Sequence, residues 1–312
     1  PWVAMQLKEY PILLYELSGR QSDDVSFDKE VLVSQLDNMM KVLEDHDLEA
    51  QMDTLRQFKR AAVLRVAVFE LLDLLPVMKA SDALTIIAEI VLQRAYELAW
   101  NQLILKHGSP RGGDESEVAR FAIVAYGKLG GIELAYGSDL DLVFLIDGDM
   151  RGNTDGEKVI NNNVFFLRLA QRLIHIVTSM TRFGVLYEVD MRLRPSGNKG
   201  PMVSTMTAFE RYQREEAWTW EHQALVRSRF VAGDEALGIR FTDLRRQLLS
   251  LKRDNDKLKG DVVEMREKMR ESLSSKTSEE DLRGNHASSL LSFDLKHDTG
   301  AIVDIEFMVQ YG

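Results

Sequence analysis

The chain contains no cysteine, which excludes a disulfide framework and a thiolate metal site and fits a reducing compartment. No apolar run is long enough to cross a membrane, and no basic-then-apolar signal segment stands at the start. The net charge of −10 argues against broad nucleic-acid binding, because attraction to phosphates requires a basic surface. The six histidines are scattered, without metal-ligand spacing. We therefore expect a cytoplasmic protein with neither a membrane nor a nucleic-acid partner. The net charge does not exclude a local basic pocket.

The composition is otherwise that of an ordinary globular protein, with 45% hydrophobic and 28% charged residues. At 312 residues the chain is long enough for two domains or for one large one. It begins at Pro1 without a methionine and stops at Gly312 directly after an apolar segment. From this we expect a piece excised from a longer protein.

The most informative stretch carries two carboxylates between two apolar runs. Phe121–Ala125 and Leu140–Ile146 are short and apolar, which predicts two buried strands. Asp139 and Asp141 lie two residues apart at the start of the second strand, so their side chains share one face. Two carboxylates this close repel each other unless a cation lies between them, and Mg²⁺ prefers such oxygen ligands. A lone Asp-x-Asp is usually a loop or capping pair, but here it coincides with two strands and a glycine pair, which favours a functional site.

The glycine pair, Gly130 and Gly131, suggests where phosphates would lie. Glycine lets the backbone approach a ligand closely, and a helix that starts there offers free N–H groups to an anion. The spacing does not match the phosphate loop of Gly, four residues, then Gly-Lys-Ser/Thr. It resembles instead the nucleotidyltransferase superfamily signature, in which an apolar residue and Gly-Gly or Gly-Ser precede a short helix and Asp-apolar-Asp.

A second charged segment runs from Gly184 to Pro195. Apolar and charged residues alternate in it, which predicts a strand with Glu188, Asp190, Arg192 and Arg194 on one face. Such alternation usually marks an exposed sheet face. Beside the Asp-x-Asp strand, however, a third carboxylate would complete a two-metal site, and arginines would hold phosphate through forked hydrogen bonds. The cationic side chains suited to a triphosphate are Lys128, Arg192, Arg194 and Lys199.

Apolar residues at three- and four-residue spacing predict helices over much of the remaining chain. The predicted helices are Phe27–Leu43, Leu48–Leu75, Ser81–Lys106 with an N-cap at Ser81-Asp82, Val159–Arg182, and one long helix over Phe241–Leu273. We expect Ser274–Ser289 to be mobile and Ser292–Gln310 to form strand, turn and strand, with Asp304 and Glu306 in a structural role. Aromatics and arginines interleave in Ala208–Arg229, and either contact with a base or plain packing would explain them.

Together these elements predict an α+β fold in three parts. Residues 1–108 form a helical region, and residues 109–235 form a nucleotidyltransferase (polymerase β-like) core with a small mixed sheet. Residues 236–312 hold the long helix, the mobile loop and the start of a truncated C-terminal segment. The boundary after the helical region falls in Gly108–Gly113, which is rich in Gly, Pro and Ser.

Four motifs carry a more specific resemblance. The stretches Phe121–Asp147, Tyr187–Pro195, Glu216–Arg229 and Phe293–Gln310, in this order, resemble the glutamine synthetase adenylyltransferase family, the bifunctional adenylyltransferase/adenylyl-removing enzymes of bacteria. The resemblance covers roughly residues 90–312. The amino-acid sequences of these motifs are more similar to the C-terminal, adenylylating domain of that family than to its adenylyl-removing domain.

The resemblance implies a function and a site. It implies that Asp139, Asp141 and Asp190 are the catalytic, metal-binding carboxylates and that Gly130, Gly131 and Ser138 form the phosphate-binding turn. It further implies transfer of AMP from ATP to a tyrosine of glutamine synthetase with two Mg²⁺ ions, and regulation of the longer enzyme by glutamine and the nitrogen regulatory protein PII.

Three alternatives are weighed against adenylylation. The paralogous removing domain would use similar carboxylates to phosphorolyse AMP-tyrosine to ADP. A nucleotide-sensing module could dispense with one carboxylate, and all three are present. A polynucleotide-adding enzyme would need a basic channel, which a net charge of −10 does not favour.

Overall fold

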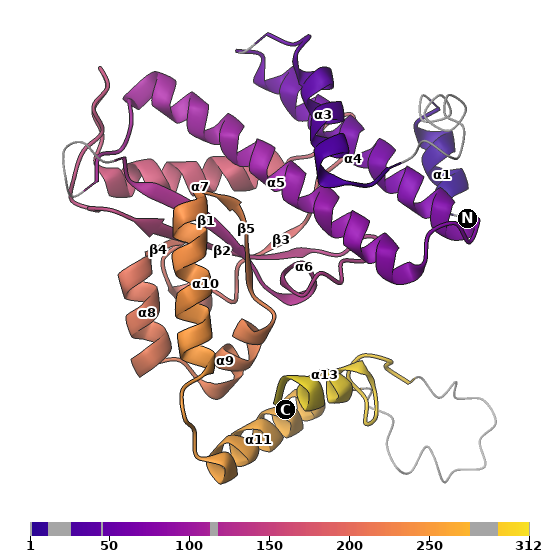
Figure 1. Ribbon diagram of the computed structural model, residues 1–312, viewed down its shortest axis with the longest axis vertical. Coiled ribbons are helices and arrows are strands. Elements are labelled where there is room, and N and C mark those ends of the chain that lie inside the picture. The colour runs from indigo at the N-terminus through magenta and orange to yellow at the C-terminus, as the bar shows by residue number, and fades with distance from the viewer. Residues whose placement is uncertain (1, 12–25, 45, 113–117, 275–292, 312) are drawn as a thin grey trace.

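A computed structural model describes residues 2–11, 26–44, 46–112, 118–274 and 293–311 (Figure 1). The strands are β1 (Arg120–Ala125), β2 (Leu140–Asp147), β3 (Val189–Asp190), β4 (Val203–Thr205) and β5 (Arg229–Gly233). The helices are α1 (Trp2–Glu9), α3 (Lys29–Met40), α4 (Leu48–Leu71), α5 (Val77–His107), α6 (Gly127–Gly130), α7 (Asn162–Thr178), α8 (Met206–Glu215), α9 (Thr219–Val226), α10 (Glu235–Leu249), α11 (Asn255–Leu273) and α13 (Ile302–Tyr311). This mixture of helices and one small sheet confirms the predicted α+β fold class.

The sheet is small and mixed, as expected. Its order is β3-β2-β1-β5, and β4 also pairs with β2. Strand β1 is antiparallel to β2 and to β5, whereas β3 and β4 run parallel to β2. The strand predicted over Gly184–Pro195 is wrong in extent, because only Val189 and Asp190 pair with β2. The residues after Asp190 turn away through a loop whose carbonyls bond to the side chain of Arg194.

Each face of the sheet is covered by its own helices, because side chains alternate along the strands. Phe121, Ile123 and Ala125 of β1 pack into the larger core with residues of α3, α4, α5 and α7. The intervening residues of β1 pack into a smaller core with α8 and α10. On β2, Val143 and Leu145 belong to this smaller core, so Asp141, two residues earlier, lies on the same side of the sheet.

Buried polar contacts join the N-terminal helices to the rest of the molecule. The guanidinium of Arg56 in α4 is fully buried and donates to the carbonyls of Gly184 at 2.7 Å and Ile176 at 3.0 Å. Helix α5 begins after Pro76 rather than at the predicted Ser81-Asp82 cap, and it ends at Gly108, whose φ is 75°. Proline tolerates the start of a helix and glycine the left-handed end. None of the described helices is long and apolar enough to cross a membrane.

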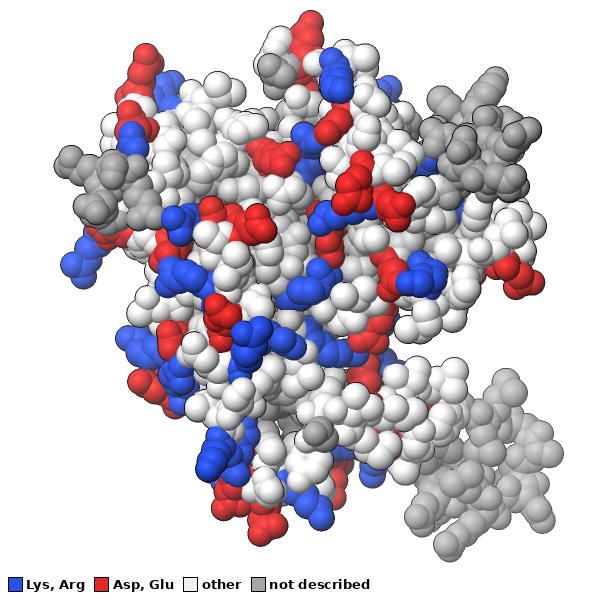
Figure 2. Space-filling model, in the orientation of Figure 1, with Lys and Arg blue, Asp and Glu red and all other residues white. Residues whose placement is uncertain are grey.

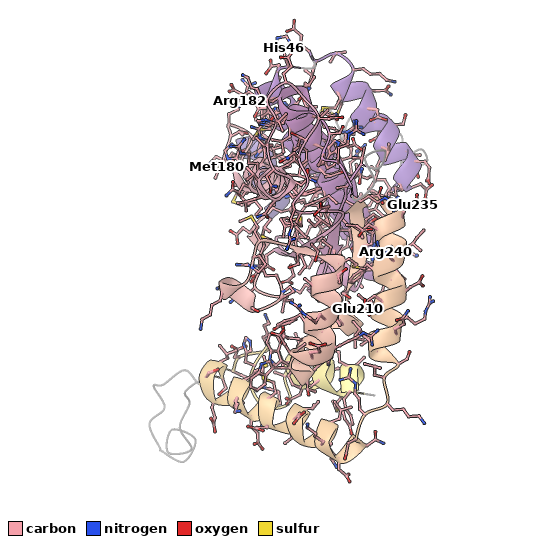
Figure 3. The ribbon with its side chains drawn as sticks, turned by 90° about the vertical axis from the view of Figure 1, so that its left-hand side faces the viewer. His46, Met180, Arg182, Glu210, Glu235 and Arg240 are labelled. Carbon is pink, nitrogen blue, oxygen red and sulfur yellow. The ribbon has the colours of Figure 1, made fainter. Side chains whose placement is uncertain are left out.

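The long helix predicted over Phe241–Leu273 is instead two helices. Helix α10 ends at Leu249, and Asp254 caps α11 by accepting from the N–H groups of Asp256 and Lys257. Seen from the side, α10 stands beside α8, with Arg240 and Glu210 labelled on them (Figure 3). The apolar stripe continues through both helices in sequence, but the hydrogen-bond ladder of α10 ends at Leu249 and the cap at Asp254 starts a second one.

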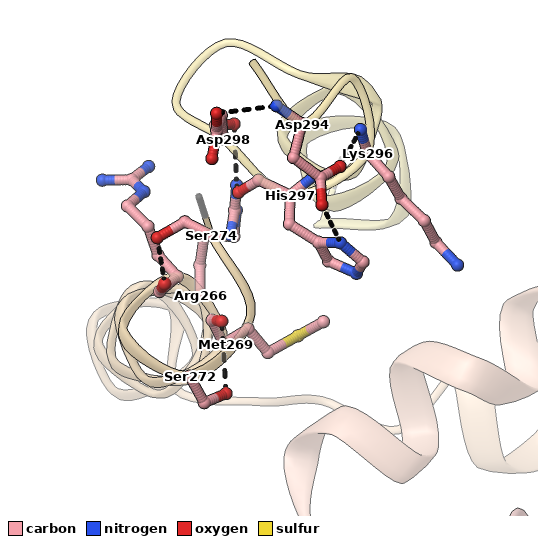
Figure 4. A network of polar contacts seen from close by, with 9 residues as sticks. Arg266, Met269, Ser272, Ser274, Asp294, Lys296, His297 and Asp298 are labelled. Atoms are coloured by element: carbon pink, nitrogen blue, oxygen red, sulfur yellow. Dashed lines mark hydrogen bonds and ion pairs between the residues drawn. The ribbon is translucent and has the colours of Figure 1, made fainter. Parts of the chain in front are cut away.

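The end of the chain is also helical, where the sequence predicted strands. Helix α13 packs on α11 and α9. Two carboxylates hold the turn before it (Figure 4). Asp294 accepts hydrogen bonds from the N–H groups of Lys296 and His297, and Asp298 accepts one from the N–H group of Asp294. Gly300, at φ 83°, then donates its N–H to Asp304 at the start of the helix. Short alternating apolar runs suit strand and helix alike, and here the turn and its capping carboxylate decide. All of the segment predicted to be mobile, Ser274–Ser289, except Ser274 lies outside the described residues.

Candidate active site

The three predicted carboxylates lie at one end of the β2–β3 pair. Asp139 is exposed just before β2, and Asp141 is the second residue of that strand. The parallel register sets Asp141 directly opposite Asp190 of β3. Glu188, which was predicted to share a strand face with Asp190, lies outside β3, is exposed, and contributes its carbonyl oxygen to the N–H of Leu140.

The electrostatics of Asp141 show how close the carboxylates are. Burial raises the pKa of Asp141 to about 6, and the negative charges of Asp139 and Asp190 act in the same direction. Arg192 and Arg227 oppose the rise. A carboxyl group that resists ionisation because it is buried and because other carboxylates lie near it is a site that a cation would stabilise.

Asp190 differs from Asp141 because an arginine holds it. Both the backbone N–H and the guanidinium of Arg192 donate to its carboxylate, at 2.8 Å and 2.6 Å. The side-chain bond from Arg192 is the main reason that the pKa of Asp190 lies below its usual value. The forked pair places a positive charge beside the site, but that charge is engaged with Asp190.

The carboxylates are ligands of the type that binds Mg²⁺, although they are not arranged as a complete metal site. Across the described ranges of the chain, no three His, Asp or Glu side chains are arranged as a ready metal-binding group. The donor set is nevertheless of the hard oxygen type that Mg²⁺ prefers. The carboxylate of Asp190 is engaged by Arg192 in this structure, so its oxygens are not free to meet a cation.

The glycine that faces the carboxylates is Gly127. The predicted helix start at Gly130–Gly131 is wrong, because α6 begins at Gly127 and the N–H groups of Gly130 and Gly131 close its turn on Tyr126 and Gly127. Gly127 has a φ of 55°, and a Cβ there would overlap a carboxylate oxygen of Asp141. The signal in the sequence is a glycine two residues after the strand, ahead of the more conspicuous pair. Gly130 has a different steric role, since a Cβ would strike the carbonyl oxygen of Arg227.

The other predicted nucleotide contacts take varied positions. Lys128 in α6 and Lys199 in the loop after β3 are exposed. Ser138 accepts from the N–H of Ala135 and so helps to close the turn before Asp139. Arg194 donates to the carbonyls of Met191, Asn198 and Gly200, so that it organises the loop rather than pointing free charge at a ligand.

Two arginines complete the surroundings, Arg229 at the start of β5 and Arg227 directly after α9, and sequence reasoning did not place them. Arg227 donates to Glu133 at 2.8 Å and to Glu306 of α13 at 3.2 Å. Arg229 donates to the carbonyl of Leu129 at 3.1 Å and pairs with Glu89 of α5. These contacts join residues more than seventy positions apart, which no local pattern signals. The face in Figure 2 shows acidic and basic side chains interspersed, as such pairs require.

The segment Ala208–Arg229, in which aromatics and arginines interleave, is buried in part and exposed in part. Tyr212 donates to both oxygens of the buried Glu221, which also accepts from the N–H of Trp218. Trp218 is 70% exposed and lines a cavity of about 840 Å³ together with Trp220 and Ser196. Part of the segment therefore packs in a polar network, and part of it borders a space beside the loop after β3.

Comparison with known proteins agrees with this geometry. The family model described as glutamate-ammonia ligase adenylyltransferase matches residues 1–244. The chain belongs to this family. The resemblance inferred from four sequence motifs is thereby confirmed.

Relatives in the glutamate-ammonia ligase adenylyltransferase family cover the whole chain. The chain is 49% identical over 314 residues to the bifunctional glutamine synthetase adenylyltransferase/adenylyl-removing enzyme of Pseudomonas putida. This alignment covers 100% of the chain and 32% of that enzyme. It is 50% identical over 313 residues to the enzyme of the same description from Hahella chejuensis, covering 99% and 32%. The chain therefore spans about a third of the length of the curated relatives that it matches.

Proposed function

We propose that this chain is the adenylylating unit of such an enzyme and moves AMP from ATP to a tyrosine hydroxyl of glutamine synthetase. The tyrosine oxygen would form a bond to the α-phosphorus while the bond to the bridging oxygen of pyrophosphate breaks. The observation that carries the proposal is the register of Asp141 beside Asp190, with Asp139 two residues before it, in a chain of this family.

We propose that Asp139, Asp141 and Asp190 hold Mg²⁺. Once bound there, Mg²⁺ would neutralise the triphosphate and the leaving pyrophosphate. The remaining contributions come from the chain itself, by positioning and charge. Gly127 leaves room for the carboxylate of Asp141 itself, and Gly130, Gly131 and Ser138 fix the turn between the two strands.

The cationic side chains are proposed to hold the phosphates. Lys128 and Lys199 are exposed and unpaired with the three carboxylates, and Arg192 would exchange Asp190 for a phosphate oxygen. Arg194 would keep the loop in place by its carbonyl contacts. The exposed indole of Trp218 offers a stacking face for the adenine in the adjacent cavity.

The paralogous removing activity is the second candidate, since similar carboxylates would serve phosphorolysis of AMP-tyrosine to ADP. The motif wording favours adenylylation. Contact with PII, which family resemblance implies for the longer enzyme, stays a prediction, as does a cytoplasmic location.

The direction is tested by two parallel assays with the chain and Mg²⁺. One supplies unmodified glutamine synthetase and ATP labelled at the α-phosphate; the other supplies AMP-modified glutamine synthetase and inorganic phosphate. We expect label on the unmodified protein and no ADP from the modified one. ADP release without labelling would identify the removing unit instead, and activity in neither assay would contradict the proposal altogether.

A further inference from the structure

A small cavity outside the proposed transfer site lies between the N-terminal helices and the segment that leads to Asp139. Its volume is about 220 Å³. Its walls are largely aliphatic: Val63, Leu84, Leu134, Val185 and Leu186. The polar groups at its surface include Lys59 of α4, Ser138 and Glu188. A space of this size fits a molecule of about ten heavy atoms, since drug-sized ligands occupy larger pockets.

Lys59 is the unusual member of this lining. Its Nζ lies 4.4 Å from the centroid of the Tyr187 ring. Burial lowers the pKa of Lys59 to about 8, and the charge of Arg60 acts in the same direction. Within the part of the chain that the structure describes, no carboxylate forms an ion pair with Lys59 and no acceptor forms a hydrogen bond with it. Glu188 borders the same cavity without pairing with it.

A half-buried ammonium in this setting is costly. It has three N–H donors, and the face of one tyrosine ring satisfies only part of their demand. By contrast, the buried guanidinium of Arg56 on the same helix donates to backbone carbonyls. An apolar side chain would fill the same place without the cost of a buried charge. The arrangement is explained if a negative group enters the cavity.

We propose that this cavity binds a small organic carboxylate, whose charged end meets Lys59 and whose apolar body lies against the aliphatic walls. One ammonium matches one negative charge. Glu188 repels either anion, but a phosphate dianion more strongly, and the dianion would also require several donors, so the lining favours the singly charged ligand. Because Ala135–Ser138 forms one wall and leads straight into Asp139, a bound carboxylate would lie against the segment that carries the proposed site.

Benzoate is a suitable probe, because it joins one carboxylate to a compact apolar ring. Calorimetry on the whole chain should give saturable binding with a dissociation constant in about the millimolar range, as its few heavy atoms allow. Lys59→Met should weaken binding by at least about tenfold, the factor that the loss of one charge-assisted contact produces. The matched control is Lys29→Met, which removes a surface ion pair with Glu89 that does not line the cavity. It should leave binding unchanged. Inorganic phosphate should not compete.

A labelling experiment on the unaltered chain covers the case in which Lys59→Met fails to fold. Trace acetylation by acetic anhydride, read by mass spectrometry of peptides, should modify Lys59 less when benzoate is present, while the exposed Lys41 reacts equally in both samples. Equal labelling of Lys59 with and without benzoate would overturn the proposal. So would benzoate binding that persists in a folded Lys59→Met chain, and competition by phosphate would overturn the choice of a carboxylate.

Discussion

At the scale of single residues, Asp141 both destabilises the metal-free protein when it is ionised and belongs to the proposed active site. Its pKa is raised from 3.8 to about 6, first by burial and then by its carboxylate neighbours. Because the folded state holds this proton more tightly than the unfolded state, the related stabilisation is complete below pH 3.8 and is lost as the pH rises through about 6. The ionised residue therefore destabilises the metal-free protein at neutral pH.

Asp141→Asn should separate these two effects. We expect the rate of adenylyl transfer to fall by ~10² to 10⁴-fold, in line with lost charge stabilisation. The same variant without metal should be more stable than the wild type at pH 7, by about 1–2 kcal/mol once partial exposure is discounted. Thermal unfolding from pH 3 to pH 8 measures the difference, which should vanish at the acid end. A variant that is less stable at pH 7, or active within a few-fold, would contradict the assignment.

Gly127 offers a second residue-scale test with an internal control. Gly127 and Gly137 both have positive φ, at 55° and 72°, so alanine strains the backbone at either position by about 1–2 kcal/mol. Only at Gly127 would the added Cβ meet Asp141, since nothing lies within 4 Å of a Cβ at Gly137. We expect similar losses of stability in the two variants but loss of transfer in Gly127→Ala alone. Equal activities would show that the approach of Gly127 to Asp141 is irrelevant to function.

At the scale of elements, α13 depends on one buried arginine of α11. Arg266 is 7% exposed, pairs with Asp304, and donates to the carbonyl of His297 at 2.9 Å. The N–H of Gly300 chiefly, and Arg266 in addition, hold the pKa of Asp304 below its usual value. The attachment of α13 to α11 therefore includes a polar contact that a single substitution can remove.

Arg266→Met should release α13 while the sheet stays intact. Removing one member of a buried pair costs about 3–5 kcal/mol, which is large for a helix of this length. Amide hydrogen exchange should rise throughout α13 and stay unchanged in β1 and β2. Lys268→Met, which removes an exposed pair with Glu264 on the same helix, serves as the control. Unchanged exchange in α13 after Arg266→Met would disprove this account of its attachment.

The contrast between α7 and α13 shows what local patterns can predict about elements. The stripe along Val159–Arg182 is long and strongly periodic, and the helix exists as α7, shorter at both ends. Ser292–Gln310 is short, and its alternation suits a strand until Asp304 caps the helix across Gly300. The break before α11 likewise rests on one capping aspartate inside a continuous apolar stripe. Element type was thus predictable where the period repeats many times, and not where one cap decides.

At the scale of the whole molecule, the sequence located the carboxylates but not their surroundings. Spacing placed Asp139 and Asp141 on one face, and the strand register brings Asp190 opposite Asp141. The sequence could not show that Arg192 would hold Asp190, because i and i+2 contacts of this kind arise in a turn and not in the extended strand that was predicted. Nor could it place Arg227 against Glu306, which depends on how α13 folds back onto α9.

The most direct test of the central claim is a crystal structure of the chain with a non-hydrolysable ATP analogue and Mn²⁺, located by its anomalous scattering. The account predicts a metal peak bounded by Asp139, Asp141 and Asp190, phosphates beside Gly127 and Lys128, and Arg192 turned from Asp190 to a phosphate oxygen. A nucleotide and metal bound elsewhere, with the pair between Arg192 and Asp190 intact, would contradict it.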